Sequence, residues 1–235
     1  MGCLSFSAIA VAAPATSTLR VLAIGNSYTQ SLMPELPLVA KAAGCNLDLA
    51  IFAIGGKSLS NHWVNCETAL KDPSFTPYLV NGKKTNLPKI LSEGKWDVVT
   101  FQEQSVDGMF PEKFNPWADR LIAYIRARQP HARLFFQLTW SDTVASHRMT
   151  EGGVKGTLDL TPDQMYEALE RNYAAQAKRL GAGIIPVGCA VQLYRRELPV
   201  TLHKPSKEAL AALKPGEVPD LKGELSGWRE WSQGE

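Results

Sequence analysis

Residues 19–29 read LRVLAIGNSYT, an almost wholly apolar run from Leu19 to Ile24 that passes at once into a glycine, an asparagine and a serine. Near-continuous apolarity is typical of a strand buried on both faces, whereas a half-exposed strand alternates. Later runs rich in β-branched or aromatic residues have the same character: 47–53 (LDLAIFA), 97–102 (DVVTFQ), 133–138 (RLFFQL) and 183–187 (GIIPV). The sequence therefore predicts five buried strands.

Segments with helical spacing lie between these strands. Apolar residues recur every three or four positions in 32–43, 116–128 and 162–180, and the last segment opens with Thr161-Pro162, a favourable helix start. Strands that alternate with helices indicate a parallel sheet covered on both faces. We therefore expect one α/β domain of the three-layer, flavodoxin-like kind, with loop insertions at 71–90 and 141–160.

The composition is that of a globular chain. Of 235 residues, 45% are hydrophobic and 20% are charged, and 25 basic residues against 23 acidic ones give a net charge of +2. This excludes long disorder and coiled coil, and gives no electrostatic reason to expect nucleic acid or an anionic membrane as a partner.

The N-terminus differs from the rest of the chain. Residues 3–15, CLSFSAIAVAAPA, are small and apolar and end in Ala13-Pro14-Ala15. This resembles the apolar region and cleavage site of a secretory signal, although a disordered leader is the alternative. We expect residues 1–17 to be a signal-like leader, residues 18–235 to form the domain, and the protein to be secreted or periplasmic in a bacterium.

The sequence contains no motif for a bound metal or nucleotide, so we expect no cofactor. No Cys-x-x-Cys or Cys/His cluster occurs, so no metal site is expected. Cys45 and Cys66 could pair in an exported protein, but free thiols are the favoured state. Gly56-Lys57-Ser58 imitates the end of a phosphate-binding loop, yet Ile51 stands where that motif needs glycine.

Polar and small residues follow each of the first three strands. Since function in such sheets lies at the carboxyl ends of the strands, these residues are the candidates for chemistry. Ser27 would stand where a helix begins, suited to a nucleophile whose own amide helps to hold an oxyanion, or it is simply a helix cap. Gly56, after the second strand, offers a second backbone N–H or marks a plain turn. Gln102 and Gln104, after the third, could donate side-chain amides or be loop surface.

Together, GNSYT, GGKSLSNHW and FQEQS resemble the sequence blocks of the SGNH (GDSL-like) hydrolase superfamily. Gly25-Asn26-Ser27 matches its first block, with asparagine where aspartate is common, and Gly56 matches its second. Residues 102–105 occupy the third block and look closer to the Gln-Gly-Glu-Ser form of the carbohydrate acetylesterase branches. The set looks most like a poorly characterised bacterial branch, over residues 19–190.

The resemblance implies a serine esterase mechanism. Ser27 would attack an ester carbonyl and form an acyl-enzyme, while the N–H groups of Ser27 and Gly56 and the side chain of Gln104, or of Gln102, would hold the oxyanion. The family's general base belongs to a C-terminal Asp-x-x-His, which occurs nowhere in this sequence. We therefore expect that the chain lacks the C-terminal part of the domain.

The histidines are the remaining candidates for a base. His203 lies in the C-terminal segment without an acidic neighbour, His62 is near the second-block glycine, and His147 lies in a predicted loop. His131 is expected at the surface.

The expected activity is hydrolysis of short, acetyl-like esters on a small molecule or carbohydrate. Because the Asp-x-x-His is missing, a non-catalytic carbohydrate-binding protein on the same fold is the alternative, and acyl transfer to another acceptor is a third.

Overall fold

The computed structural model describes residues 18–142, 160–197, 208 and 212. Within this part of the chain, five strands form one parallel sheet in the order β2-β1-β5-β6-β7. The strands are β1 (Thr18–Gly25), β2 (Asn46–Ala53), β5 (Val98–Phe101), β6 (Arg133–Gln137) and β7 (Gly183–Ile185). Renumbered along the chain, the order is 2-1-3-4-5, as in flavodoxin-like folds. The predicted fold class is confirmed.

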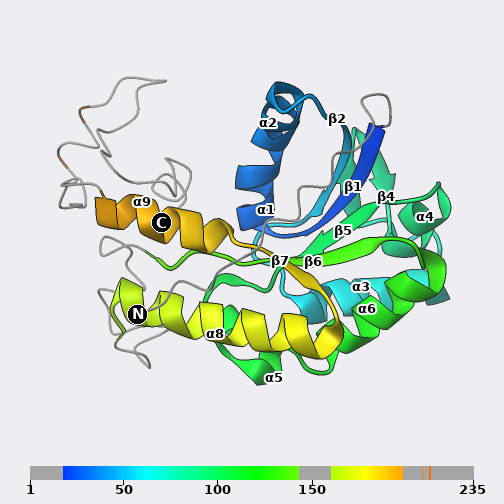
Figure 1. Ribbon diagram of the computed structural model, residues 1–235. Helices are drawn as coiled ribbons and strands as arrows, with labels where there is room; N and C mark the ends of the chain where they lie inside the picture. Colours follow the sequence, from blue (N-terminus) through cyan, green and yellow to red (C-terminus); the bar gives the residue numbers. More distant parts are fainter. Residues whose placement is uncertain (1–17, 143–159, 198–207, 209–211, 213–235) are drawn as a thin grey trace.

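Helices cover both faces of this sheet (Figure 1). On one face lie α1 (Ser27–Leu32), α2 (Leu36–Ala42) and α9 (Val187–Glu197), and on the other lie α3 (Leu59–Lys71), α6 (Trp117–Arg128) and α8 (Pro162–Leu180). The split follows from right-handed crossovers, because the chain moves one way from β1 to β2 and the other way in each later step.

Most of the core lies between the sheet and the face of α3, α6 and α8. Leu22, Ile24, Phe52 and Phe101 from the strands are fully buried there, together with Tyr173 of α8. A smaller cluster on the opposite face joins Tyr28 of α1, Trp140 after β6 and Val191 of α9. The strands are thus buried on both faces, as their near-continuous apolarity predicts.

The segment 32–43 is divided rather than being one helix. It contains the end of α1, a 3₁₀ turn η1 (Met33–Glu35) and α2. Pro34 and Pro37 explain the division, since proline supplies no N–H to a continuing helix.

The segment 71–90 contains more than the predicted loop. Strands β3 (Tyr78–Val80) and β4 (Lys83–Thr85) form an antiparallel hairpin, and α4 (Leu87–Ser92) begins directly after it. Asn81 and Gly82 connect the strands with φ of 49° and 76°. Positive φ at both positions is the geometry that Asn-Gly favours in a two-residue hairpin turn.

Two short elements follow β5. They are the 3₁₀ turn η2 (Ser105–Met109) and the helix α5 (Pro111–Phe114). Residues 1–17 of the predicted leader and residues 143–159 of the predicted second loop lie outside the described residues.

Candidate active site

The carboxyl ends of β1, β2 and β5 lie at the same level of the sheet. Gly25 pairs with Ala53, and Ile24 pairs with Phe101. The residues that leave these strands therefore emerge side by side. The order of the strands also reverses between β1 and β5, and this is the position where open α/β sheets bind ligands.

Ser27 is the first residue of α1 and is exposed. The N-cap of this helix is Asn26, whose Oδ1 accepts a hydrogen bond from the Tyr28 N–H at 3.1 Å. Since asparagine performs the capping, the Ser27 hydroxyl is not needed for it. That hydroxyl makes no hydrogen bond to any other residue that the structure describes.

Asn26 is held by a buried polar chain. Its Nδ2 donates to the Lys57 carbonyl at 2.9 Å, and its Oδ1 accepts a short hydrogen bond from Gln102 Nε2. Gln102 Oε1 in turn accepts from the Thr29 hydroxyl at 3.0 Å. Asn26, Thr29 and Gln102 are at most 1% exposed. The turn that presents Ser27 is therefore fixed from β5 as well as from its own helix.

Gly56 lies in an exposed turn that is anchored to the end of β1. The Ile54 N–H donates to the Gly25 carbonyl at 3.1 Å, the Lys57 N–H closes the turn onto Ile54 at 3.2 Å, and the Lys57 carbonyl accepts from Asn26. Gly56 itself has a φ of 68°, in the left-handed region that favours glycine. The structure thus brings the Gly56 turn against the turn of Ser27.

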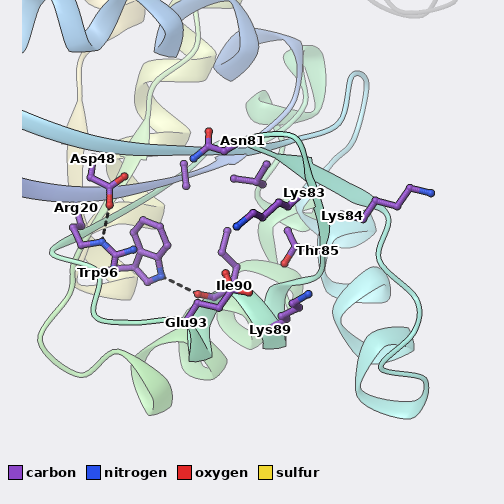
Figure 2. A pocket seen from close by; sticks show the side chains of 12 residues that line it. Arg20, Asp48, Asn81, Lys83, Lys84, Thr85, Lys89, Ile90, Glu93 and Trp96 are labelled. Carbon is purple, nitrogen blue, oxygen red and sulfur yellow. Dashed lines mark hydrogen bonds and ion pairs between the residues drawn. The ribbon is translucent and has the colours of Figure 1, made fainter.

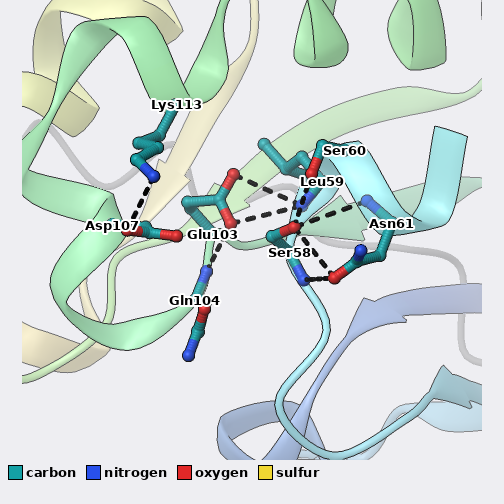
Figure 3. A network of polar contacts seen from close by, with 8 residues as sticks. All are labelled: Ser58, Leu59, Ser60, Asn61, Glu103, Gln104, Asp107 and Lys113. Atoms are coloured by element: carbon teal, nitrogen blue, oxygen red, sulfur yellow. Dashed lines mark hydrogen bonds and ion pairs between the residues drawn. The ribbon is translucent and has the colours of Figure 1, made fainter. Parts of the chain in front are cut away.

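The two candidate amides after β5 differ in their surroundings. Both polar ends of the Gln102 side chain are engaged, with Asn26 and Thr29. The Gln104 side chain is half-buried, extends away from Glu103 in Figure 3, and makes no hydrogen bond within the described part of the chain. Of the two, Gln104 has the amide that is free to meet a ligand.

His62 lies on α3 and is 1% exposed. Its Nδ1 is 2.7 Å from the Tyr78 hydroxyl, and the two rings stack with centroids 5.7 Å apart. Burial lowers the pKa of His62 to about 4, with Lys57 acting in the same direction and the Gly25 backbone opposing it. His62 is therefore a neutral core residue at pH 7, placed beneath the end of β1.

The other histidines supply no base within the described residues. His131 is exposed, as predicted, and precedes β6 at the opposite edge of the sheet. His147 and His203 lie outside the described residues, so their predicted roles stay predictions.

Glu103 is a site residue that sequence reasoning missed. Its side chain is fully buried and accepts hydrogen bonds from the backbone N–H groups of Leu59 and Gln104. The available signal was an acidic residue directly after an apolar strand, since an unpaired carboxyl is rarely buried without a reason. The capping role of Asn26 was also foreseeable, because asparagine is among the preferred N-cap residues.

A pocket of about 200 Å³ lies elsewhere, beside the β3–β4 hairpin (Figure 2). In its wall, Arg20 already binds both Asp48 and Trp96: Arg20 Nε is 2.8 Å from Asp48 Oδ2, and the guanidinium stands 4.4 Å from the centre of a Trp96 ring. These residues belong to the beginnings of strands, so the pocket is at the edge opposite Ser27.

The described residues contain no group of three or more His, Cys, Asp or Glu side chains placed to hold a metal ion. Cys45, Cys66 and Cys189 are free thiols there. None of the helices described combines the length and apolarity needed to cross a membrane.

Comparison with known proteins gives matches in structure alone. No protein-family model matches the chain, and no curated protein matches its sequence. A DUF4886 family protein from Bacteroides uniformis is 26% identical, with a TM-score of 0.65 over 76% of this chain and 71% of that one. A protein from Slackia heliotrinireducens described as a candidate SGNH hydrolase is 21% identical, with a TM-score of 0.55 over 81% of this chain and 91% of that one. The resemblance indicated by the three strand-end motifs is confirmed: the chain has the fold of the SGNH (GDSL-like) hydrolases.

Proposed function

We propose that this protein is a secreted serine esterase that removes short, acetyl-like acyl groups from carbohydrate, with Ser27 as the nucleophile. The observation that carries the proposal is the placement of Ser27. It is exposed at the start of α1, which follows the strand between β2 and β5, so that Ser27 lies at the switch point of the sheet and beside the Gly56 turn.

The proposed reaction follows from these groups. Ser27 Oγ attacks the ester carbonyl while a base takes its proton, and the oxyanion accepts hydrogen bonds from the N–H of Ser27, the N–H of Gly56 and Gln104 Nε2. Collapse of this intermediate expels the alcohol, which takes up the proton, and leaves an acyl group on Ser27. Water then releases the acid and regenerates the hydroxyl.

The acyl and carbohydrate preferences rest on the third sequence block. Gln102-Glu103-Gln104-Ser105 is similar to the block of the carbohydrate acetylesterase branches, and the signal-like leader supports export. The general base is proposed to be His203, the histidine of the C-terminal segment.

The decisive experiment is hydrolysis of p-nitrophenyl acetate by the full chain and by Ser27→Ala. We expect the Ser27→Ala rate to fall to the uncatalysed background. Ser92→Ala is the matched control, because Ser92 is also an exposed helical serine, and its hydroxyl donates only to the Lys89 carbonyl of its own helix. Equal rates for wild type and Ser27→Ala would exclude the mechanism.

A second measurement tests the preference. Wild type should release acetate from acetylated xylan and should act faster on p-nitrophenyl acetate than on the octanoate ester. A preference for octanoate would contradict the proposed acyl size.

A non-catalytic carbohydrate-binding protein is the second candidate. The observation that favours it concerns His62, the histidine nearest to the Ser27 turn among the described residues. His62 is buried in the core and hydrogen-bonded to Tyr78, so it is not placed to serve as a base for Ser27. Binding of an acetylated xylo-oligosaccharide, measured by calorimetry and unaccompanied by any acetate release, would support this candidate over the esterase.

A further inference from the structure

The fully buried carboxyl of Glu103 joins the two segments that carry the proposed oxyanion donors Gly56 and Gln104. It accepts the Gln104 N–H at 2.6 Å on Oε1, and it receives the Leu59 N–H at 3.2 Å on Oε1 and 3.3 Å on Oε2. Figure 3 shows the carboxyl group lying between the end of β5 and the first turn of α3.

Each of these two contacts is with a residue that carries, or lies close to, a proposed oxyanion donor. Gln104 carries the side-chain amide that makes no hydrogen bond within the described residues. Leu59 is the first residue of α3, three positions after Gly56, and Ser58 caps the helix between them. One carboxyl group therefore sets the separation between the Gly56 turn and the Gln104 backbone.

Glu103 is itself fixed from a third element. Its own N–H donates to the Tyr173 hydroxyl of α8 at 2.9 Å, and Tyr173 is fully buried. The Glu103 backbone is thus fixed to α8. A carboxyl group that positions two oxyanion donors needs such a fixed backbone.

The residue type fits positioning better than packing. A buried carboxyl is costly, and no basic side chain in the described part of the chain pairs with this one, since the nearby Lys113 is paired with Asp107 at 3.4 Å. An apolar residue would fill the space without that cost, but would leave the two N–H groups without an acceptor.

We propose that Glu103 is a positioning residue of the esterase site, whose carboxyl group holds the Gly56 turn and Gln104 at the spacing that an oxyanion needs. This rests on the proposed function.

The charge state of Glu103 gives the site a distinctive pH response. Burial raises the pKa of Glu103 to about 8, with Asp107 of η2 acting in the same direction and Lys113 of α5 and the two N–H groups opposing it. Tyr173 of α8 also faces the carboxyl. Below pH 8 the group is neutral. Above pH 8 it carries a negative charge beside the Gln104 and Leu59 amides, and this charge would disfavour an oxyanion held by the adjoining turns.

The test measures kcat and KM for p-nitrophenyl acetate in Glu103→Ala and Glu103→Gln. We expect kcat of Glu103→Ala to fall about 10²-fold with little change in KM, as when an oxyanion donor is misplaced. Glu103→Gln keeps an acceptor and resembles the neutral acid, so at pH 7 its kcat should stay within a few-fold of wild type. Wild type should lose activity above pH 8, and Glu103→Gln should not.

Glu112→Gln is the matched control, because Glu112 is exposed on the neighbouring α5. Wild-type kcat in Glu103→Ala, or equal losses in Glu103→Ala and Glu103→Gln with parallel pH profiles, would overturn the proposal.

Hydrogen exchange separates this proposal from the esterase itself. If wild type shows no Ser27-dependent hydrolysis, the proposed function fails. The positioning role of Glu103 is then tested by the exchange rates of the Gln104 and Leu59 backbone amides. Faster exchange at Gln104 and Leu59 in Glu103→Ala, with slow exchange kept in Glu103→Gln, supports the positioning role. Unchanged exchange at both amides in Glu103→Ala refutes it.

Discussion

Gly25, the last residue of β1, has no room for a side chain. A Cβ atom there would stand 2.2 Å from Thr29 Oγ1 and 2.9 Å from Gln102 Cγ. Both neighbours belong to the buried chain of hydrogen bonds that holds Asn26. Glycine is therefore needed at this position so that Thr29 and Gln102 can approach the backbone. A larger residue would displace these two side chains and so disturb the turn of Ser27.

Gly25→Ala should accordingly lower the free energy of unfolding by about 1–3 kcal/mol, the usual cost of overpacking a core. It should also reduce the Ser27-dependent rate. Urea denaturation and p-nitrophenyl acetate hydrolysis are the measurements. Gly55→Ala is the control, since its nearest atom would be Gln30 Oε1 at 3.9 Å. Equal stabilities of the two variants would show that the space around Gly25 is not limiting.

At the scale of elements, α3 begins with a capping box. Ser58 Oγ accepts from the Asn61 N–H, and the Asn61 side chain accepts from the Ser58 N–H at 3.1 Å. The start of α8 is built in the same way from Thr161 and Gln164. The two caps differ in their surroundings, because only the first adjoins the Gly56 turn and Glu103.

Ser58→Ala and Thr161→Ala should each lower the free energy of unfolding by about 1 kcal/mol, as loss of a cap usually does. Only Ser58→Ala should reduce kcat, because it alone loosens the Gly56 turn. Thermal melts and initial rates of both variants check this pair. Similar kcat values in the two would mean that the start of α3 does not influence the site.

Much of the arrangement of elements could be predicted from local patterns. The strands were located because buried parallel strands are continuously apolar, and the sheet order follows from crossover rules. The hairpin at Asn81-Gly82 was missed although its turn signal was present, because the neighbouring prolines and lysines suggested a loop.

The position of Ser27, Gly56 and Gln104 at one edge of the sheet could also be predicted, because each of them follows the end of a strand. The contacts of Gln102 with Asn26 and of Glu103 with Leu59 join residues 76 and 44 positions apart, and no local pattern reports such pairs.

At the scale of the whole molecule, two buried groups set opposing pH dependences. His62 titrates near 6.5 when unfolded and at about 4 when folded, so its contribution to stability is lost as pH falls from 6.5 to 4. Glu103 titrates near 4.5 when unfolded and at about 8 when folded, so stability is lost as pH rises through that window. Their effects oppose each other between 4.5 and 6.5, and above 6.5 only that of Glu103 remains.

The free energy of unfolding should therefore decline from pH 6.5 to 8, by at most about 1.4 kcal/mol per pH unit for one group. Glu103→Gln should abolish this decline, and the exposed Glu112→Gln should retain it. Urea denaturation at pH 5.5, 6.5, 7.2 and about 8 measures the slope. A wild-type slope that persists in Glu103→Gln would assign the decline to other groups.

The position of β1 between β2 and β5 has a consequence for synthesis. A ribosome delivers β1 first, and one edge can pair with β2 as soon as Ala53 has emerged, whereas the other edge waits for Val98–Phe101. During that interval the nascent chain carries an open, apolar strand edge, which is a template for unwanted association. Ser27, the proposed nucleophile, is thus translated early, but the turn that presents it receives its support from Gln102 only after about the first hundred residues have been made.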